Sequence, residues 1–164
     1  MQKTDHHYIQ LVNQLAEQTA ALGFDPFAAI LVQKDEVVAT SMDKCIDYSD
    51  PTAHAELILI SEYCRKQKLI SLEGYSMYCN VEPCMMCAGA IHWSRLSKVV
   101  YSVSQEQLKG VSKGNTKPNC QALIQQLGNK VEVIGPINSE QGMTVLNKYP
   151  FLSKKERHKK FYKK

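Results

Sequence analysis

Two short stretches of the sequence contain residue types that can bind a metal ion and move protons. The first, TAHAE, contains His54 and Glu56, and the second, EPCMMC, contains Cys84 and Cys87. Imidazole and thiolate groups are zinc ligands, and a set of three protein ligands is typical of catalytic zinc, which keeps its fourth position for water. The two stretches together predict a catalytic zinc ion on His54, Cys84 and Cys87.

Each stretch on its own is compatible with several kinds of site. A C-x-x-C pair also occurs in redox motifs, iron–sulfur sites and structural zinc sites, and a lone H-x-E is compatible with a surface histidine. A structural zinc site needs a fourth ligand, and the candidates, His92, Cys79 and Cys64, have no suitable spacing. A redox pair leaves the H-x-E stretch without a role. The catalytic interpretation accounts for both stretches.

Glu56 follows His54 by two residues. From there its carboxylate can reach a water molecule in the fourth position without itself binding the metal. Zinc lowers the pKa of such a water to about 7, so Glu56 can accept its proton and later deliver a proton to a leaving amine. We therefore predict Glu56 as the catalytic acid–base group. A zinc-stabilised binding protein without catalysis is a further hypothesis, but such a protein has no need of this carboxylate.

Strands and helices that alternate along the chain must position these groups. Apolar spacing and the placement of Gly and Pro indicate helices at 5–22, 52–68, 83–95, 120–127 and 139–146, and strands at 26–32, 37–40, 75–81, 98–103 and 131–134. Residues 42–51 and 105–118 are expected to be loops. The alternation predicts an α/β layered domain. Both sulfurs then lie on the first turn of a helix, where the thiolate form is favoured.

Composition indicates an ordinary globular protein with one folded domain. The chain has 164 residues, of which 44% are hydrophobic and 22% charged. We expect a zinc-dependent domain at 1–150 and a basic tail at 151–164. The sequence has neither a recognisable signal peptide nor a membrane-spanning segment, so we expect a cytoplasmic protein without a membrane partner. The six cysteines are then free thiols or metal ligands, and Cys45, Cys64, Cys79 and Cys120 receive no role.

The positive charge is concentrated at the C-terminus. Residues 154–164 contain seven Lys or Arg and one Glu, whereas the whole chain has a net charge of +4. Such a tail can bind phosphates, with Phe161 and Tyr162 available to stack on bases. A charged run is more often a solvated, partly disordered end, and that is the interpretation we favour.

The combination of H-x-E with a later P-C-x-x-C resembles the signature of zinc nucleobase deaminases. Residues 50–56 and 82–95 are similar to the cytidine-deaminase-like superfamily, in the branch of guanine deaminases and tRNA adenosine deaminases. The resemblance implies a three-layer α/β/α sandwich around a mixed five-stranded sheet. It also implies zinc on His54, Cys84 and Cys87, a proton shuttle at Glu56, and a homodimer with active sites near the subunit interface.

The resemblance also implies residues that contact the substrate. Phe27 and Trp93 match aromatic positions of the guanine branch, although ordinary core packing accounts for both equally well. Asp43 lies eleven residues before His54, where both kinds of relative usually have an asparagine. Because a carboxylate only accepts hydrogen bonds, Asp43 favours a ring that presents N–H donors, unless it is a solvated loop residue. The peptide N–H near Ala55 is expected to hold the developing oxygen.

Neither kind of relative is matched completely. Residues 105–119 lack both the acidic G-F-D-D-like segment of guanine deaminases and the G-A-x-G-S-like segment of the tRNA enzymes. We therefore expect hydrolytic deamination of a small nucleobase or nucleoside, most simply a guanine-like purine or a related amino-heterocycle. The alternative is deamination of adenosine in a tRNA.

Overall fold

The computed structural model describes residues 4–112, 118–128 and 130–161. One sheet runs through the molecule, with strand order β2-β1-β3-β4-β5. The strands are β1 (Ala28–Gln33), β2 (Glu36–Met42), β3 (Ser76–Val81), β4 (Lys98–Val103) and β5 (Glu132–Ile134). β1 is antiparallel to both β2 and β3, whereas β3, β4 and β5 are parallel. The sheet is therefore mixed and five-stranded, as expected.

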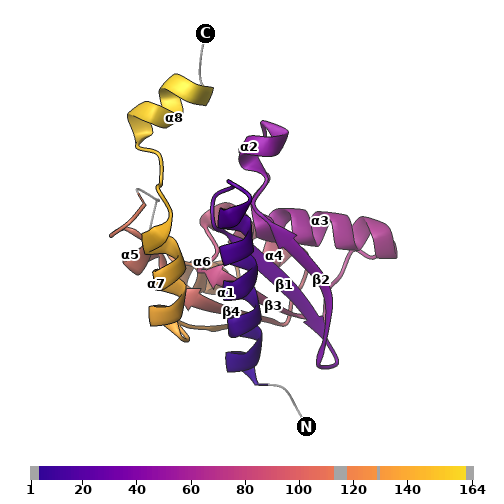
Figure 1. Ribbon diagram of the computed structural model, residues 1–164. Coiled ribbons are helices and arrows are strands. Elements are labelled where there is room, and N and C mark those ends of the chain that lie inside the picture. Colours follow the sequence, from indigo (N-terminus) through magenta and orange to yellow (C-terminus); the bar gives the residue numbers. More distant parts are fainter. Residues whose placement is uncertain (1–3, 113–117, 129, 162–164) are drawn as a thin grey trace.

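Helices cover both faces of this sheet (Figure 1). One face carries α1 (Asp5–Ala21) and α7 (Ser139–Lys148), and the other carries α3 (Ala55–Gln67), α4 (Met85–Trp93) and α6 (Cys120–Gln126). This arrangement confirms the three-layer α/β/α sandwich. Within the described residues, no helix has the length and apolar character needed to cross a membrane.

The sequence of β1 shows why the sheet needs a helix layer on each side. Side chains alternate between the two faces of a strand. Ile30 and Val32 pack with Ile9 of α1 in one core cluster, whereas Ala29 and Leu31 pack in a second core cluster on the opposite face. A strand that is apolar on both faces is stable only when both faces are covered.

Three short helices lie where loops or a solvated tail were expected. α2 (Cys45–Tyr48) and α5 (Gln105–Leu108) each span four residues. α8 (Lys154–Phe161) occupies the basic tail and extends away from the sheet. The basic tail is therefore helical over Lys154–Phe161, and its exposed Lys155, Lys159 and Lys160 agree with the solvated end that was expected. A reciprocal pair of hydrogen bonds stabilises the start of α8: Ser153 N donates to Glu156 Oε2 (2.7 Å), and Glu156 N donates to Ser153 Oγ (3.3 Å).

Candidate metal centre and active site

The metal-binding side chains lie at the starts of two helices. His54 is the N-cap residue of α3 and Cys84 is the N-cap residue of α4, and neither side chain caps its own helix. Cys87 follows in the first turn of α4 and is buried. His54 Nδ1 lies 3.6 Å from Cys84 Sγ and 3.7 Å from Cys87 Sγ, and the two sulfurs are 3.6 Å apart. The fold thus brings the three predicted ligands together.

These distances fit a tetrahedral zinc site. With zinc–sulfur bonds of about 2.3 Å and zinc–nitrogen bonds of about 2.0 Å, tetrahedral geometry requires ligand separations of about 3.8 Å between sulfurs and about 3.5 Å between sulfur and nitrogen. Among the described residues, no fourth His, Cys or carboxylate donor joins the set. His92, Cys79 and Cys64, the candidates for a fourth structural ligand, are outside it. The donor set fits zinc with one position left for water.

The three ligand side chains of the metal-free cluster differ in how readily they lose a proton. The hydrogen bond with Cys87 lowers the pKa of Cys84 to about 4. Hydrogen bonds to Cys45 and Cys84 raise the pKa of His54 to about 11. The hydrogen bond with Cys84 and burial raise the pKa of Cys87 far above its ordinary value. Before a metal binds, the cluster therefore contains one thiolate and one imidazolium.

Glu56 lies in the first turn of α3, and its side chain is 8% exposed. Burial raises the pKa of its carboxyl group to about 7. A group with that pKa can both accept and release a proton near neutral pH, which is the property a general acid–base residue needs.

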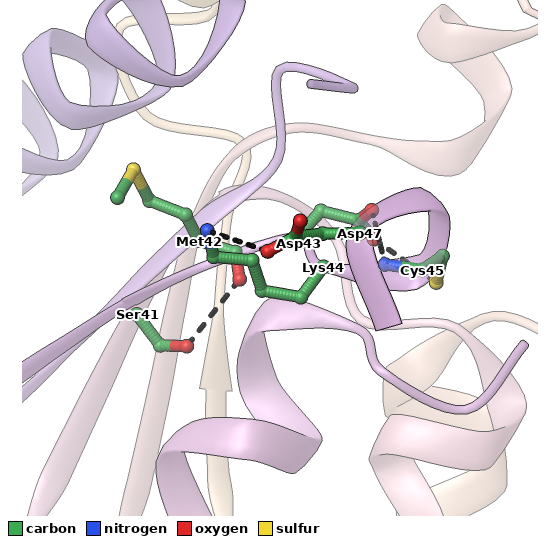
Figure 2. Close-up of polar contacts among 6 residues, drawn as sticks. All are labelled: Ser41, Met42, Asp43, Lys44, Cys45 and Asp47. Carbon is green, nitrogen blue, oxygen red and sulfur yellow. Dashed lines mark hydrogen bonds and ion pairs between the residues drawn. The ribbon is translucent and has the colours of Figure 1, made fainter. Parts of the chain in front are cut away.

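Asp43 lies beside the cluster, and its residue is only 4% exposed. Its Oδ1 accepts a hydrogen bond from the backbone N–H of Cys45 (3.1 Å), and its Oδ2 accepts one from Cys45 Sγ (3.4 Å), as Figure 2 shows. The adjacent backbone is tied to the metal site, because Lys44 N donates to the carbonyl of Ala53 (2.9 Å). The alternative interpretation of Asp43 as a solvated loop residue is therefore wrong.

Phe27 is linked to Asp43 by a backbone hydrogen bond, and Ala55 directly follows His54 in the chain. The carbonyl of Phe27 accepts a hydrogen bond from Asp43 N (2.9 Å). The Phe27 ring is half-buried and packs near Phe151, with ring centroids 5.9 Å apart. Ala55 is buried and is the first residue of α3, so its N–H has no partner within the helix. Both residues stay predictions as substrate contacts.

The structure does not bring Trp93 to the metal cluster within one chain. Trp93 is the last residue of α4, whereas Cys84 precedes the first. A helix of this length separates its ends by about 13 Å. The Trp93 side chain is 81% exposed and lines a concave region with Ile70 and Arg95.

Sequence reasoning missed two polar groups near the site. Glu82 is 4% exposed, and its carboxylate accepts hydrogen bonds from the backbone N–H of Gln105 and of Cys120, both at 2.9 Å. A charged residue at the end of a buried strand was a signal for such a role. Cys45, next to Asp43 in space, had no signal beyond its short sequence distance from Asp43.

A layered α/β domain with an imidazole, two thiolates and a buried carboxylate at its helix starts has the donor set of a catalytic zinc enzyme. Residues 2–103 match the family described as "Cytidine and deoxycytidylate deaminase zinc-binding region". The chain belongs to this family of zinc-dependent deaminases. The cluster of His54, Cys84 and Cys87 has the donors and the spacing to hold the zinc ion. The protein is accordingly a hydrolytic deaminase.

Similar proteins differ in their substrates. The chain is 33% identical over 105 residues to the tRNA-specific adenosine deaminase of Aquifex aeolicus, covering 64% of this chain and 70% of the relative. It is 36% identical over 77 residues to the guanine deaminase of Bacillus subtilis, covering 47% and 49% of the two chains. A solved structure of the guanine deaminase from Nitrosomonas europaea has a TM-score of 0.79 at 20% identity, over 88% of this chain and 83% of that one. This last likeness shows the fold.

Proposed function

We propose that the protein removes an amino group from a guanine-like purine or a related amino-heterocycle. The observation that supports this most directly is the buried Asp43 carboxylate beside His54. Each carboxylate oxygen can accept more than one hydrogen bond, so Asp43 can bind Cys45 and still accept from a substrate N–H. Guanine has an N–H donor at N1, where adenine has an acceptor, and a buried carboxylate would face that acceptor unfavourably.

The residues of the chain divide the reaction between them. Zinc, when bound, supplies a Lewis acid that makes water nucleophilic near neutral pH. Glu56, with its pKa near 7, takes a proton from the attacking water and gives it to a ring nitrogen. It then takes the remaining proton of the added hydroxyl and gives it to the leaving amino group, which departs as ammonia. The N–H of Ala55, at the start of α3, donates to the oxygen that gains charge. Asp43 orients the ring.

The substrate proposal is tested by exchanging the carboxylate for an amide. In an assay of ammonia release from guanine, isoguanine and adenine, the zinc-loaded protein should prefer the rings with N–H donors. Asp43→Asn should move the preference toward adenine by at least tenfold in relative kcat/KM. Asp47→Asn is the matched control, because it makes the same change on the exposed side of α2. Activity on adenine alone in the unchanged protein would contradict the proposal.

A second candidate substrate is adenosine within a tRNA, favoured by the basic helix α8. Lys155, Lys159 and Lys160 are exposed there, and several similar proteins are named tRNA-specific adenosine deaminase. Tyr162, which the sequence offers with Phe161 for stacking on bases, lies outside the described residues.

Removal of residues 154–164 separates the two candidates. If tRNA is the substrate, the shortened protein should bind tRNA more weakly and with a smaller dependence on salt, because fewer phosphates are neutralised. Activity on free bases should not change. Undetectable or salt-insensitive tRNA binding by the full chain would exclude the tRNA candidate.

We also propose that the protein acts as a homodimer. Two large apolar side chains, Ile70 (93% exposed) and Trp93 (81% exposed), line one concave region of about 840 Å³ together with the charged Glu73 and Arg95. Large exposed apolar side chains among polar neighbours are a feature of interaction sites. A substrate contact for Trp93 would then be made across the interface, in the active site of the partner subunit.

A further inference from the structure

The side of the active site formed by Asp43 contains a second group of metal-binding atoms. An oxygen of Asp43, the sulfur of Cys45 and a ring nitrogen of His54 all lie within 4.8 Å of one another. This group contains a carboxylate, a thiol and an imidazole, which are the three kinds of side chain that bind zinc in proteins. It shares His54 with the catalytic set but includes neither Cys84 nor Cys87.

The distance between Asp43 and Cys45 suits a shared metal ion. Asp43 Oδ2 and Cys45 Sγ are 3.4 Å apart. Two ligands with bonds of about 2.0 Å and about 2.3 Å to a tetrahedral zinc ion are separated by about 3.5 Å. The pair that shares the thiol proton of Cys45 could therefore share an ion in its place, with little movement of either side chain (Figure 2).

Charges of both signs lie around Asp43. Burial raises the pKa of Asp43, the charge of His54 lowers it, and the smaller effect of the buried Asp25 raises it. Once zinc is bound, His54 is a neutral ligand and no longer opposes a second cation. The neighbouring cation, Lys44, is directed elsewhere: its Nζ lies 3.5 Å from Asp47 and over the ring of Phe24. The carboxylate and thiolate would neutralise a divalent ion.

We propose that Asp43 and Cys45 form a second, weaker metal site beside the catalytic zinc. The His54 ring lies next to this site but is not one of its ligands. Nδ1 of His54 faces the catalytic sulfurs, so the second ion depends on Asp43 and Cys45 for its protein bonds and on solvent for the rest. A site with two protein ligands binds less tightly than one with three. The second ion is therefore bound after the first.

An ion at this site makes excess metal inhibitory, because it occupies the oxygens with which Asp43 would bind a substrate. This consequence rests on the proposed function, whereas the metal site itself does not. Measuring bound metal instead of activity keeps the two apart, because a protein that deaminates nothing can still bind a second ion.

Cobalt titration of the zinc-loaded protein tests the site. Cobalt–thiolate bonds absorb in the near ultraviolet, and zinc and cobalt can be counted separately in the same sample by atomic emission. We expect one cobalt per chain, a thiolate charge-transfer band, and zinc retained at one per chain. Cys45→Ala should abolish the band, and Asp43→Asn should weaken cobalt binding at least tenfold. Cys64→Ala, which removes another half-buried thiol, should change neither.

Three outcomes would overturn the proposal. The first is the absence of cobalt binding by the zinc-loaded protein. The second is an unchanged band in Cys45→Ala, which would place the ion elsewhere. The third is zinc loss in step with cobalt uptake, which would show exchange at the catalytic site. Retention of one zinc per chain in Cys45→Ala confirms that this variant is folded, and Asp43→Asn provides an independent test.

Discussion

Before zinc binds, the protons of the metal cluster are held by His54 and Cys87. The pKa of His54 is raised to about 11 and that of Cys87 is raised further, whereas the pKa of Cys84 is lowered to about 4. Zinc requires a neutral imidazole and two thiolates. We therefore predict that zinc binding releases two protons per chain throughout the range from about pH 5.5 to about pH 10, as measured by a pH indicator in weak buffer.

The same proton count sets how zinc affinity depends on pH. Because two protons compete with the ion, apparent affinity should fall about a hundredfold for each unit by which pH is lowered in this range. With ordinary pKa values, the release would instead decline from nearly three protons near pH 5.5 to well under one near pH 10. A release that varies in that way would show that the pKa values of His54, Cys84 and Cys87 are not shifted in the metal-free protein.

Glu56 gives a second prediction for a single residue. Glu56→Gln removes the group that transfers protons but keeps its size, so zinc should remain at one per chain while kcat falls by roughly a hundredfold to ten-thousandfold. Zinc content and ammonia release should be measured on the same sample. A variant with unchanged kcat would show that another group transfers the protons.

At the scale of elements, the close contact between α7 and β4 depends on Gly142. A Cβ atom at this position would lie 2.6 Å from Ser102 Oγ and 2.6 Å from a methyl group of Val103. Ser102 Oγ cannot move aside freely, because it accepts a hydrogen bond from Asn13 and donates one to the carbonyl of Asn138. Overpacking of this kind costs about 1–3 kcal/mol, and the helix preference of alanine offsets up to about 1 kcal/mol of it. Gly142→Ala should therefore lower the free energy of unfolding by up to about 2 kcal/mol.

Gly89→Ala is the matched control for this prediction. Gly89 also lies within a helix, but a Cβ atom there meets nothing within 4 Å. The same substitution should therefore stabilise the protein by up to about 1 kcal/mol, because alanine favours the helix. Denaturant unfolding of the two zinc-loaded variants at one protein concentration should show shifts of opposite sign. A loss of stability in both would mean that helix packing at Gly142 is not the cause.

The elements themselves differed in how well the sequence predicted them. The strand at 98–103 was predicted with the bounds of β4, because a run of apolar and β-branched residues is a strong local signal. α2 and α5 were missed, since four residues are too few to show a helical period. The metal ligands were predicted because their spacing places them on helix starts. The contact of Asp43 with Cys45 and the burial of Glu82 depend on how loops fold in space, which residue spacing does not encode.

At the scale of the whole molecule, we predict a dimer that depends on Trp93. Trp93→Glu replaces one of the two large exposed apolar side chains of this concave region with a charge, and sedimentation equilibrium should show that the mass of the particle falls by half. Leu22→Glu is the control, because Leu22 is also exposed (61%) but lies just after α1. A wild-type protein that is monomeric at all concentrations, or a dimer that persists in Trp93→Glu, would contradict the proposed interface.

The carboxylate of Glu82 also has a consequence for how this protein can diversify. It binds the backbone at Gln105 and at Cys120, which are the two ends of the stretch that matches neither kind of relative. It also immediately precedes the Pro83-Cys84 pair that begins the thiolate helix. Because both ends of the stretch are held by the residue that precedes the thiolate helix, we expect changes in its length to leave the zinc ligands in place as long as the buried Leu108 is kept. The length of that stretch and the metal chemistry can then vary independently among related sequences.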